Sequence, residues 1–129
     1  MQIEVEVNPT EDVSKVKQAV ENIFGSLNLE EKLQQGGSSL LTTLTKNRES
    51  LVKFKQLLRR ERIRDAARTV LLKSLDKDTI SFNLNKQVAF VGHLSFCEPV
   101  AESPLGPIKV KITSDNPKKL IDWLTPRAL

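Results

Sequence analysis

Half of the Lys and Arg residues of this chain lie in one stretch, residues 46–73. The stretch holds ten of the twenty basic residues and only three acidic ones, so its net charge is plus seven. An arginine side chain offers a planar fork of N–H donors that matches phosphate oxygens, and each neutralised phosphate releases counterions. The types and density of these residues therefore predict a surface that binds a phosphate backbone.

The spacing of the basic residues predicts how a helix would display them. Residues 46–73 contain neither glycine nor proline, so we expect one long helix that begins near Asn47 or Arg48 and ends before Asp76. On a helical wheel the basic residues form two rows that flank an apolar seam. The candidate RNA-binding residues are Lys55, Arg59, Arg62 and Lys73 in one row, and Lys53, Arg60 and Arg64 in the other.

Between the two rows runs a seam whose members are spaced alternately three and four residues apart. Its members are Leu51, Phe54, Leu58, Glu61, Asp65, Arg68, Leu72 and Leu75. An uncompensated buried charge costs several kcal/mol, so we expect the three charged members to be paired or hydrated, as buried polar or interface residues. Asp65 and Arg68 can pair within the helix, whereas Glu61 can share an arginine of its own chain or of a partner chain.

Several interpretations of the long helix remain open at this point. The basic residues could simply form a solvated face, could bind RNA phosphates, or could bind an acidic protein. The scarcity of acidic residues argues against the first, because a helix with many salt bridges alternates its charges. A separate alternative is that the seam from Leu51 to Leu75 packs against its own copy, which would make the protein a homodimerisation module without a nucleic-acid role.

The sequence offers little for catalysis. His93 and Cys97 lie four residues apart on what the pattern indicates is one strand, too far for direct proton transfer without a bend. Asp76 and Asp78 fit a turn better than a cation site, and Gly36-Gly37 lacks the lysine and the spacing of a phosphate loop. We therefore predict a protein that is not an enzyme and needs no metal or cofactor.

The aromatic residues bear on the kind of RNA that could bind. The chain has no tyrosine. Four aromatic residues lie in patterns typical of buried positions, namely Phe82, Phe90, Phe96 and Trp123. Proteins that read single strands by sequence usually stack the bases on exposed aromatic side chains. We therefore predict that the partner RNA is structured or double-stranded and is contacted through its backbone.

The elements before the basic stretch have clear signals. Gln2–Val7 alternates apolar and polar residues as a half-buried strand does. A helix should follow, capped by Thr10 or Asp12 and stopped by Gly25. We then expect a hairpin in which a strand around residues 27–33 turns at two glycines into a strand over residues 40–45.

After the basic stretch we expect a second hairpin, a loop, a strand and a last helix. The hairpin would join residues 80–84 to a strand within residues 88–96, and the prolines of residues 98–107 predict a loop. Residues 108–112 alternate as the first strand does, so Glu4 and Glu6 could face Lys109 and Lys111. The last helix would be capped by Asp115 or Asn116, with Pro117 in its first turn.

This order of elements predicts an α+β fold with a largely antiparallel sheet and with the long helix and two shorter helices packed on one face. The length of 129 residues and the ordinary composition suggest one domain over residues 1–129. Its N-terminus lacks the apolar core of a signal peptide and no run could cross a membrane, so we expect a cytoplasmic protein. The single cysteine, Cys97, excludes an internal disulfide.

Three blocks of the sequence resemble an uncharacterised archaeal family of predicted RNA-binding proteins. They are LRRERIRDAAR (Leu58–Arg68), NPTEDVSKVKQAVENIF (Asn8–Phe24) and PLGPIKVKITSDNPKKLIDWLTP (Pro104–Pro126). The resemblance spans nearly the whole chain, although none of the blocks is a catalytic or ligand signature. It implies a fold like that of the ribosomal protein of the large subunit that binds five-S RNA, and a role in binding RNA.

Overall fold

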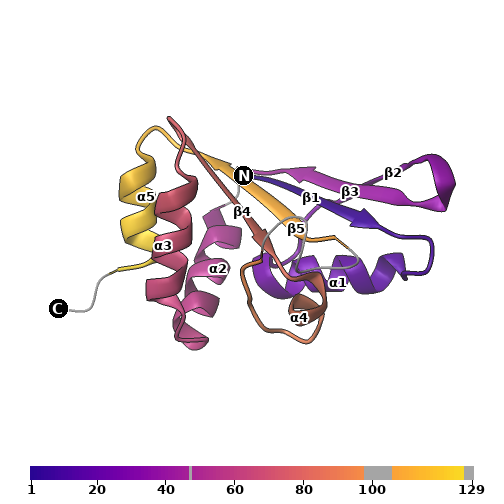
Figure 1. Cartoon of the computed structure of the whole chain (residues 1–129), viewed down its shortest axis with the longest axis horizontal. Coiled ribbons are helices and arrows are strands. Elements are labelled where there is room, and N and C mark those ends of the chain that lie inside the picture. Colours follow the sequence, from indigo (N-terminus) through magenta and orange to yellow (C-terminus); the bar gives the residue numbers. More distant parts are fainter. Residues whose placement is uncertain (47, 98–105, 127–129) are drawn as a thin grey trace.

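A five-stranded antiparallel sheet forms one layer of the molecule, and helices α1 to α5 lie on one of its faces (Figure 1). The computed structural model describes residues 1–46, 48–97 and 106–126. The strands are β1 (Gln2–Val7), β2 (Glu30–Leu33), β3 (Ser39–Leu44), β4 (Thr79–Leu84) and β5 (Ile108–Thr113), in the spatial order β2-β3-β1-β5-β4. The helices are α1 (Val13–Phe24), α2 (Arg48–Arg60), α3 (Arg64–Ser74), α4 (Lys86–Phe90) and α5 (Pro117–Leu124), and a 3-10 turn, η1 (Gln35–Gly37), joins β2 to β3. The α+β architecture and the antiparallel sheet are confirmed.

The first strand has the bounds and the buried face that its alternation predicts. Ile3, Val5 and Val7 are buried, and β1 pairs with β3 on one side and β5 on the other. The predicted charge pairing across β1 and β5 holds in part. Glu4 lies opposite Lys109, but Lys111 lies opposite Gln2, and Glu6 lies beyond the end of β5 and is paired with Leu40 of β3.

The first and last helices begin at caps that the sequence predicted. The Oδ1 atom of Asp12 accepts a hydrogen bond from the Ser14 amide at 2.9 Å, and the Asn116 side chain accepts one from the Lys119 amide at 3.1 Å. These bonds satisfy amides that have no partner within a helix. Gly25 ends α1 with φ of 83°, a conformation that favours glycine.

The predicted long helix is wrong in one respect: it is two helices, α2 and α3, joined by a tight turn at residues 61–63 (Figure 1). Arg62 adopts a left-handed φ of 57°, which is uncommon outside glycine, and reverses the direction of the chain. A straight helix of this length would run about 40 Å, and its two halves could not both reach one core. The turn instead lets Leu58 of α2 and Leu71 of α3 be fully buried in the same core.

The predicted second hairpin is also wrong, because the segment after β4 forms α4 and a turn rather than a strand. The Asn85 side chain accepts a hydrogen bond from the Val88 amide at 3.0 Å and thereby caps α4. Asn22 of α1 donates to the carbonyl oxygens of Ala89 and Phe90, which holds α4 against α1. In place of the expected strand pairing, the described residues have an isolated bridge between Leu84 and Phe96, with backbone hydrogen bonds from Asn85 to Ser95 and from Cys97 to Asn83. Most of the predicted loop at residues 98–107 lies outside the described residues.

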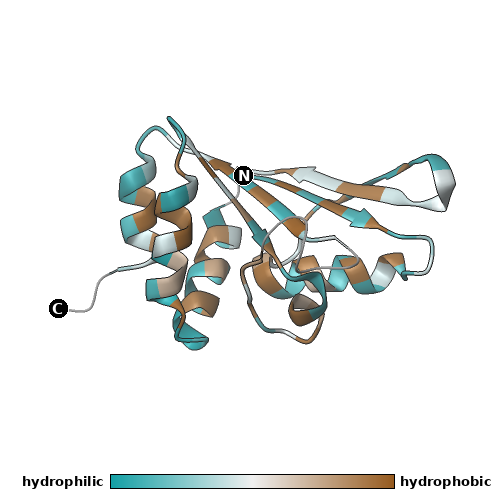
Figure 2. Cartoon of the chain, in the orientation of Figure 1, coloured by the Kyte–Doolittle hydropathy of each residue, from teal (hydrophilic) through white to brown (hydrophobic). Residues whose placement is uncertain are grey.

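The core lies between the sheet and the helices, where hydrophobic residues recur along the strands and in each helix (Figure 2). Its centre is a row of aromatic rings in which Phe54 of α2 packs between Phe24 of α1 and Phe82 of β4. The ring centroids are 5.5 Å and 5.3 Å apart. Burying a phenylalanine contributes roughly 1.5–3 kcal/mol, so this row anchors the middle of α2. In the described part of the chain, no helix has both the length and the apolar character needed to cross a membrane.

Candidate nucleic-acid interface

Residues 59–64, which we call the α2–α3 tip, gather four arginines and one glutamate at the turn between the two helices. Arg59 and Arg60 end α2, Arg62 occupies the turn, and Arg64 begins α3. Arg59, Arg60 and Arg62 are exposed, and Arg64 is half-buried. The tip lies at the end of the helices farthest from the sheet (Figure 1). The fold therefore places these four arginines at one protruding turn rather than within a continuous helix.

Ion pairs within residues 1–46, 48–97 and 106–126 leave most of the arginine charge at the tip unneutralised. Among the described residues, Arg59, Arg62 and Arg64 have no carboxylate within 4.0 Å. Arg60 donates a hydrogen bond to the carbonyl oxygen of Gly92 at 2.7 Å, which leaves its charge in place. The tip is therefore a local region of positive potential that faces solvent.

The two predicted basic rows lie on opposite flanks of α2, and each flank contacts a neighbouring element. On one flank, Lys53 donates a hydrogen bond to the carbonyl oxygen of Glu21 at 3.0 Å. Glu21 lies in the last turn of α1, where a positive charge is favourable because it complements the helix dipole. On the other flank, Nζ of Lys55 lies 4.6 Å from the ring centroid of Trp123 in α5. Both lysines thus make internal contacts that the sequence could not indicate.

The two basic rows of α2 do not continue into α3, because the turn at residues 61–63 gives α3 a different direction from α2. Lys73 lies nine residues beyond Arg64, and this separation corresponds to about 13 Å along the axis of α3. It is exposed at the opposite end of α3 from the tip. Of the seven basic residues predicted to bind RNA, the structure brings Arg59, Arg60, Arg62 and Arg64 together and leaves Lys73 apart.

Glu61 connects the tip to the loop that follows α4. Its Oε1 atom accepts hydrogen bonds from Nδ1 of His93 at 2.8 Å and from the amide of Leu94 at 3.1 Å. The hydrogen bond from His93 lowers the pKa of Glu61 below its usual range and outweighs the opposing effect of burial. Together with the bond from Arg60 to Gly92, these contacts fix the shape of the tip.

The other two charged members of the seam have different surroundings. Arg68 is largely buried, and its Nη2 atom lies 2.7 Å from Oδ1 of Asp122 in α5. Asp65 is exposed, so the expected pairing of Asp65 with Arg68 is replaced by a contact between helices. Phe54 and Leu58 of the seam are fully buried in the chain's own core. These two side chains are therefore not at the surface, where a second copy could pack against them.

Two aromatic residues that the sequence predicted to be buried are exposed. Phe90 is 42% exposed, because the segment around it is a helix rather than a strand. Trp123 is 40% exposed, because Ile121 and Leu124 take the inward positions of the short α5. The expectation of buried aromatics, on which the preference for structured or double-stranded RNA rested, is therefore wrong for Phe90 and Trp123.

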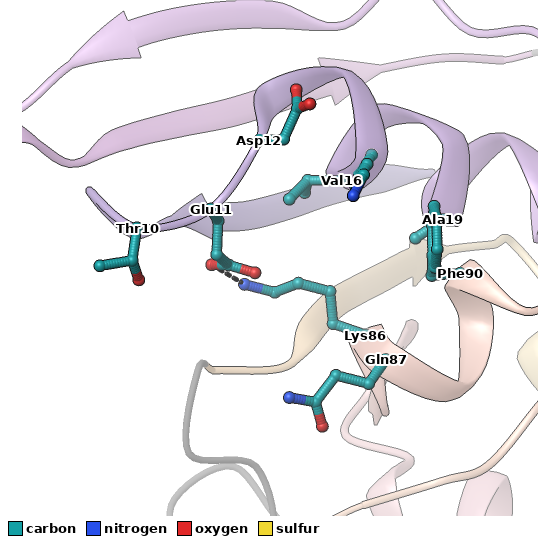
Figure 3. A pocket seen from close by; sticks show the side chains of 9 residues that line it. Thr10, Glu11, Asp12, Val16, Ala19, Lys86, Gln87 and Phe90 are labelled. Carbon is teal, nitrogen blue, oxygen red and sulfur yellow. Dashed lines mark hydrogen bonds and ion pairs between the residues drawn. The ribbon is translucent and has the colours of Figure 1, made fainter.

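A second polar site, which the sequence did not indicate, lies between α1 and α4 (Figure 3). It is a pocket of about 310 Å³ in which the side chains of Glu11 and Lys86 point toward each other. Lys86 donates to Oε1 of Glu11 at 2.9 Å and to the carbonyl oxygen of Glu6 at 2.7 Å. Glu11 also accepts from the amide and the side chain of Asn8. Through these hydrogen bonds, the Glu11–Lys86 pair connects β1 and the turn that follows it to α4. The pair therefore has a structural role.

Of the residues considered for catalysis, His93 has a partner that the structure identifies. His93 bonds to Glu61 on an exposed surface. Within residues 1–46, 48–97 and 106–126, no three His, Cys, Asp or Glu side chains are grouped so that they could hold a metal ion. The basic tip is thus the strongest candidate site in this part of the chain.

A family model described as RNA binding matches residues 1–114, so this α+β chain belongs to the class of proteins that the model describes. Within that class, the chain belongs to the UPF0201 family of archaeal proteins. It is 51% identical over 125 residues to a UPF0201 protein of Sulfurisphaera tokodaii, and the match covers 97% of this chain and 86% of the relative. The resemblance to an archaeal family of predicted RNA-binding proteins is confirmed.

Solved structures support the same assignment. The crystal structure of a UPF0201 protein from Methanococcus jannaschii is similar, with a TM-score of 0.88 and 37% identity, covering 99% of this chain and 93% of that one. A DUF54 protein from Methanothermobacter thermautotrophicus has a TM-score of 0.67 and 18% identity over 95% of this chain and 92% of its own. The latter likeness concerns the fold alone.

Proposed function

We propose that the protein binds structured RNA without catalysing a reaction, and that the α2–α3 tip contacts the RNA backbone. The observation that carries this proposal is the cluster at the tip, where Arg59, Arg62 and Arg64 have no acidic partner among the described residues. Arginine is well suited to phosphate because its donors form a rigid fork. In an archaeal cell the RNA partner would be found in the cytoplasm.

The contacts around the tip support the proposal because they hold it in shape before RNA arrives. Arg60 is bonded to Gly92, and Glu61 is bonded to His93 and Leu94, so the turn is attached to a second loop. A binding surface that is already ordered loses less conformational entropy on association. Phosphate contacts of this kind fix position and orientation on the RNA and carry no sequence information themselves.

The test is to measure the affinity for a structured RNA hairpin at several salt concentrations. We expect the affinity of the wild type to fall steeply with salt, because binding releases counterions. The double variant Arg59→Glu/Arg62→Glu should bind more weakly by at least about tenfold and should show a shallower salt dependence. A flat salt dependence of the wild type would reject the proposal.

A matched control separates a local effect from an effect of net charge. Lys15 and Lys32 are exposed on α1 and β2. The double variant Lys15→Glu/Lys32→Glu changes the net charge as much as the tip variant does. If both double variants weaken binding equally, then the tip is not the contact surface.

A further inference from the structure

Trp123 presents an exposed aromatic ring beside basic residues of two helices. The ring is 40% exposed, although tryptophan carries a large apolar surface. Nζ of Lys55 lies 4.6 Å from its centroid, a distance typical of a cation–π contact. The ring thus has a cation at one side and still offers surface to solvent.

Further positive charges lie one helical turn away along each of the two helices. Arg59 lies four residues after Lys55, so it is one turn farther along the same side of α2, toward the tip. Lys119 lies four residues before Trp123 on the same side of α5. The neighbouring carboxylate, Asp122, is engaged by Arg68 on the side toward α3. The Trp123 site therefore consists of one ring and three cations, Lys55, Arg59 and Lys119.

An aromatic ring among cations matches the chemistry of a nucleotide. A base can stack on the ring because every base has a flat π face, and the cations can neutralise the phosphates on either side. A base paired within a helix is not available for such stacking, whereas an unpaired base is.

We propose that Trp123 stacks on an unpaired base of the bound RNA while Lys55, Arg59 and Lys119 contact the flanking phosphates. This inference rests on the proposed function and specifies its partner as an RNA in which an unpaired nucleotide adjoins the segment held by the tip. Arg59 belongs to both surfaces, which makes the tip and the Trp123 site continuous along α2.

Phe90 is similarly exposed but lacks these surroundings. It lines the pocket between α1 and α4 together with Glu11, Asp12, Lys15 and Lys86, so charges of both signs surround it. Those carboxylates would repel phosphate. Phe90 is therefore the matched control for Trp123.

The experiment uses the fluorescence of the full chain, which contains one tryptophan and no tyrosine. Wild-type protein is titrated with a hairpin RNA that has an unpaired loop, and separately with a fully paired blunt duplex carrying the same number of phosphates. We expect the hairpin to quench the emission of Trp123 strongly and the duplex to change it little. This measurement needs no variant and so does not depend on one that folds.

Affinities of three variants complete the test. Trp123→Ala should weaken binding of the hairpin by about tenfold, since stacking on one aromatic ring contributes this order of affinity, and should leave duplex binding unchanged. Trp123→Phe should retain most of the hairpin affinity, and Phe90→Ala should match the wild type.

The outcomes distinguish this inference from the proposed function. If the hairpin binds with a steep salt dependence but neither quenches Trp123 nor loses affinity in Trp123→Ala, the stacking site is rejected and the backbone contact stands. Equal losses in Trp123→Ala and Phe90→Ala would also reject it. If neither RNA binds, both proposals are overturned.

Discussion

Nζ of Lys86 in α4 lies 2.9 Å from Oε1 of Glu11, and the exposed fractions of the two side chains are only 3% and 12%. The same ammonium group donates to the carbonyl oxygen of Glu6, and the carboxylate accepts two bonds from Asn8. Each charge is thus compensated by its partner and by further hydrogen bonds, as a buried ion pair requires. The pair ties the end of β1 to α4, whose few residues have little intrinsic helical stability.

Removing the cation of this pair should destabilise the protein strongly. We expect Lys86→Ala to lower the free energy of unfolding by about 3–5 kcal/mol, because it leaves a buried carboxylate without its partner. Urea denaturation measures this change. The control is Lys15→Ala, which removes an exposed lysine from the rim of the same pocket and should change stability by less than about 0.5 kcal/mol. Equal midpoints for the two variants would show that the buried pair does not stabilise the fold.

The same pair should make stability depend on acid pH. Burial by itself would raise the pKa of Glu11, but the hydrogen bonds from Lys86 and Asn8 outweigh it and hold the pKa below its ordinary value of 4.5. The unfolded chain therefore binds a proton at a higher pH than the native chain does. The stabilisation is fully present above the ordinary pKa and is lost as pH falls through the lowered native pKa.

This dependence can be checked with Glu11→Gln, which cannot ionise. Urea midpoints are measured for the wild type and the variant from neutral pH down to about pH 2. We expect a constant advantage of the wild type above the ordinary pKa of Glu11, and a convergence of the two curves at lower pH. Parallel curves over the whole range would mean that Glu11 does not have a lowered pKa in the native state.

An element of this fold can be predicted from the sequence when the residues that specify it are close together along the chain. The alternation of β1 and the caps of α1 and α5 involve residues within a few positions of one another, and these elements were predicted correctly. The turn at Arg62 has no glycine or proline to mark it. It forms because both helices bury their apolar sides in one core, which is a tertiary effect. The prediction of a strand after β4 was wrong for a similar reason. The segment forms α4, which is held in place by hydrogen bonds from α1.

The candidate site was predictable in its charge but not in its shape. The density of arginines in residues 59–64 is evident in the sequence. The internal contacts of Lys53 and Lys55, the exposure of Trp123 and the burial of Lys86 all depend on neighbours distant in sequence. No pattern along the chain could have indicated which basic residues the fold would leave for a partner.

The contact between His93 and Glu61 gives a further prediction. Replacing His93 by alanine removes the main cause of the lowered pKa of Glu61, so this pKa should rise toward its ordinary value of 4.5. Because the lowered pKa marks an interaction absent from the unfolded chain, the variant should also lose some stability above that pH. An NMR titration of the side-chain carboxyl carbon reports the change directly. The control Ser95→Ala alters the same loop without touching Glu61, and a matching shift there would refute the role of His93.

A substitution at Arg62 can remove one of the four arginine charges of the tip while keeping the shape of the turn. Its φ of 57° lies in the left-handed region, which glycine adopts without strain. We therefore expect Arg62→Gly to change the free energy of unfolding by no more than about 1 kcal/mol, because relief of strain offsets the greater freedom of the unfolded chain. Binding to the hairpin RNA should nevertheless weaken. The slope of log affinity against log salt should decrease in magnitude by about 1, which corresponds to the loss of one phosphate contact.

Lys73→Ala is the control for this variant, because it also removes one positive charge but from the opposite end of α3. If the tip is the contact surface, Lys73→Ala should keep the wild-type slope, since a charge about 13 Å along the helix from Arg64 lies more than one Debye length away at physiological salt. Binding isotherms at four or more salt concentrations for the wild type and the two variants decide the question. Equal slopes for Arg62→Gly and Lys73→Ala would mean that the RNA senses only net charge, and the tip would lose its special role.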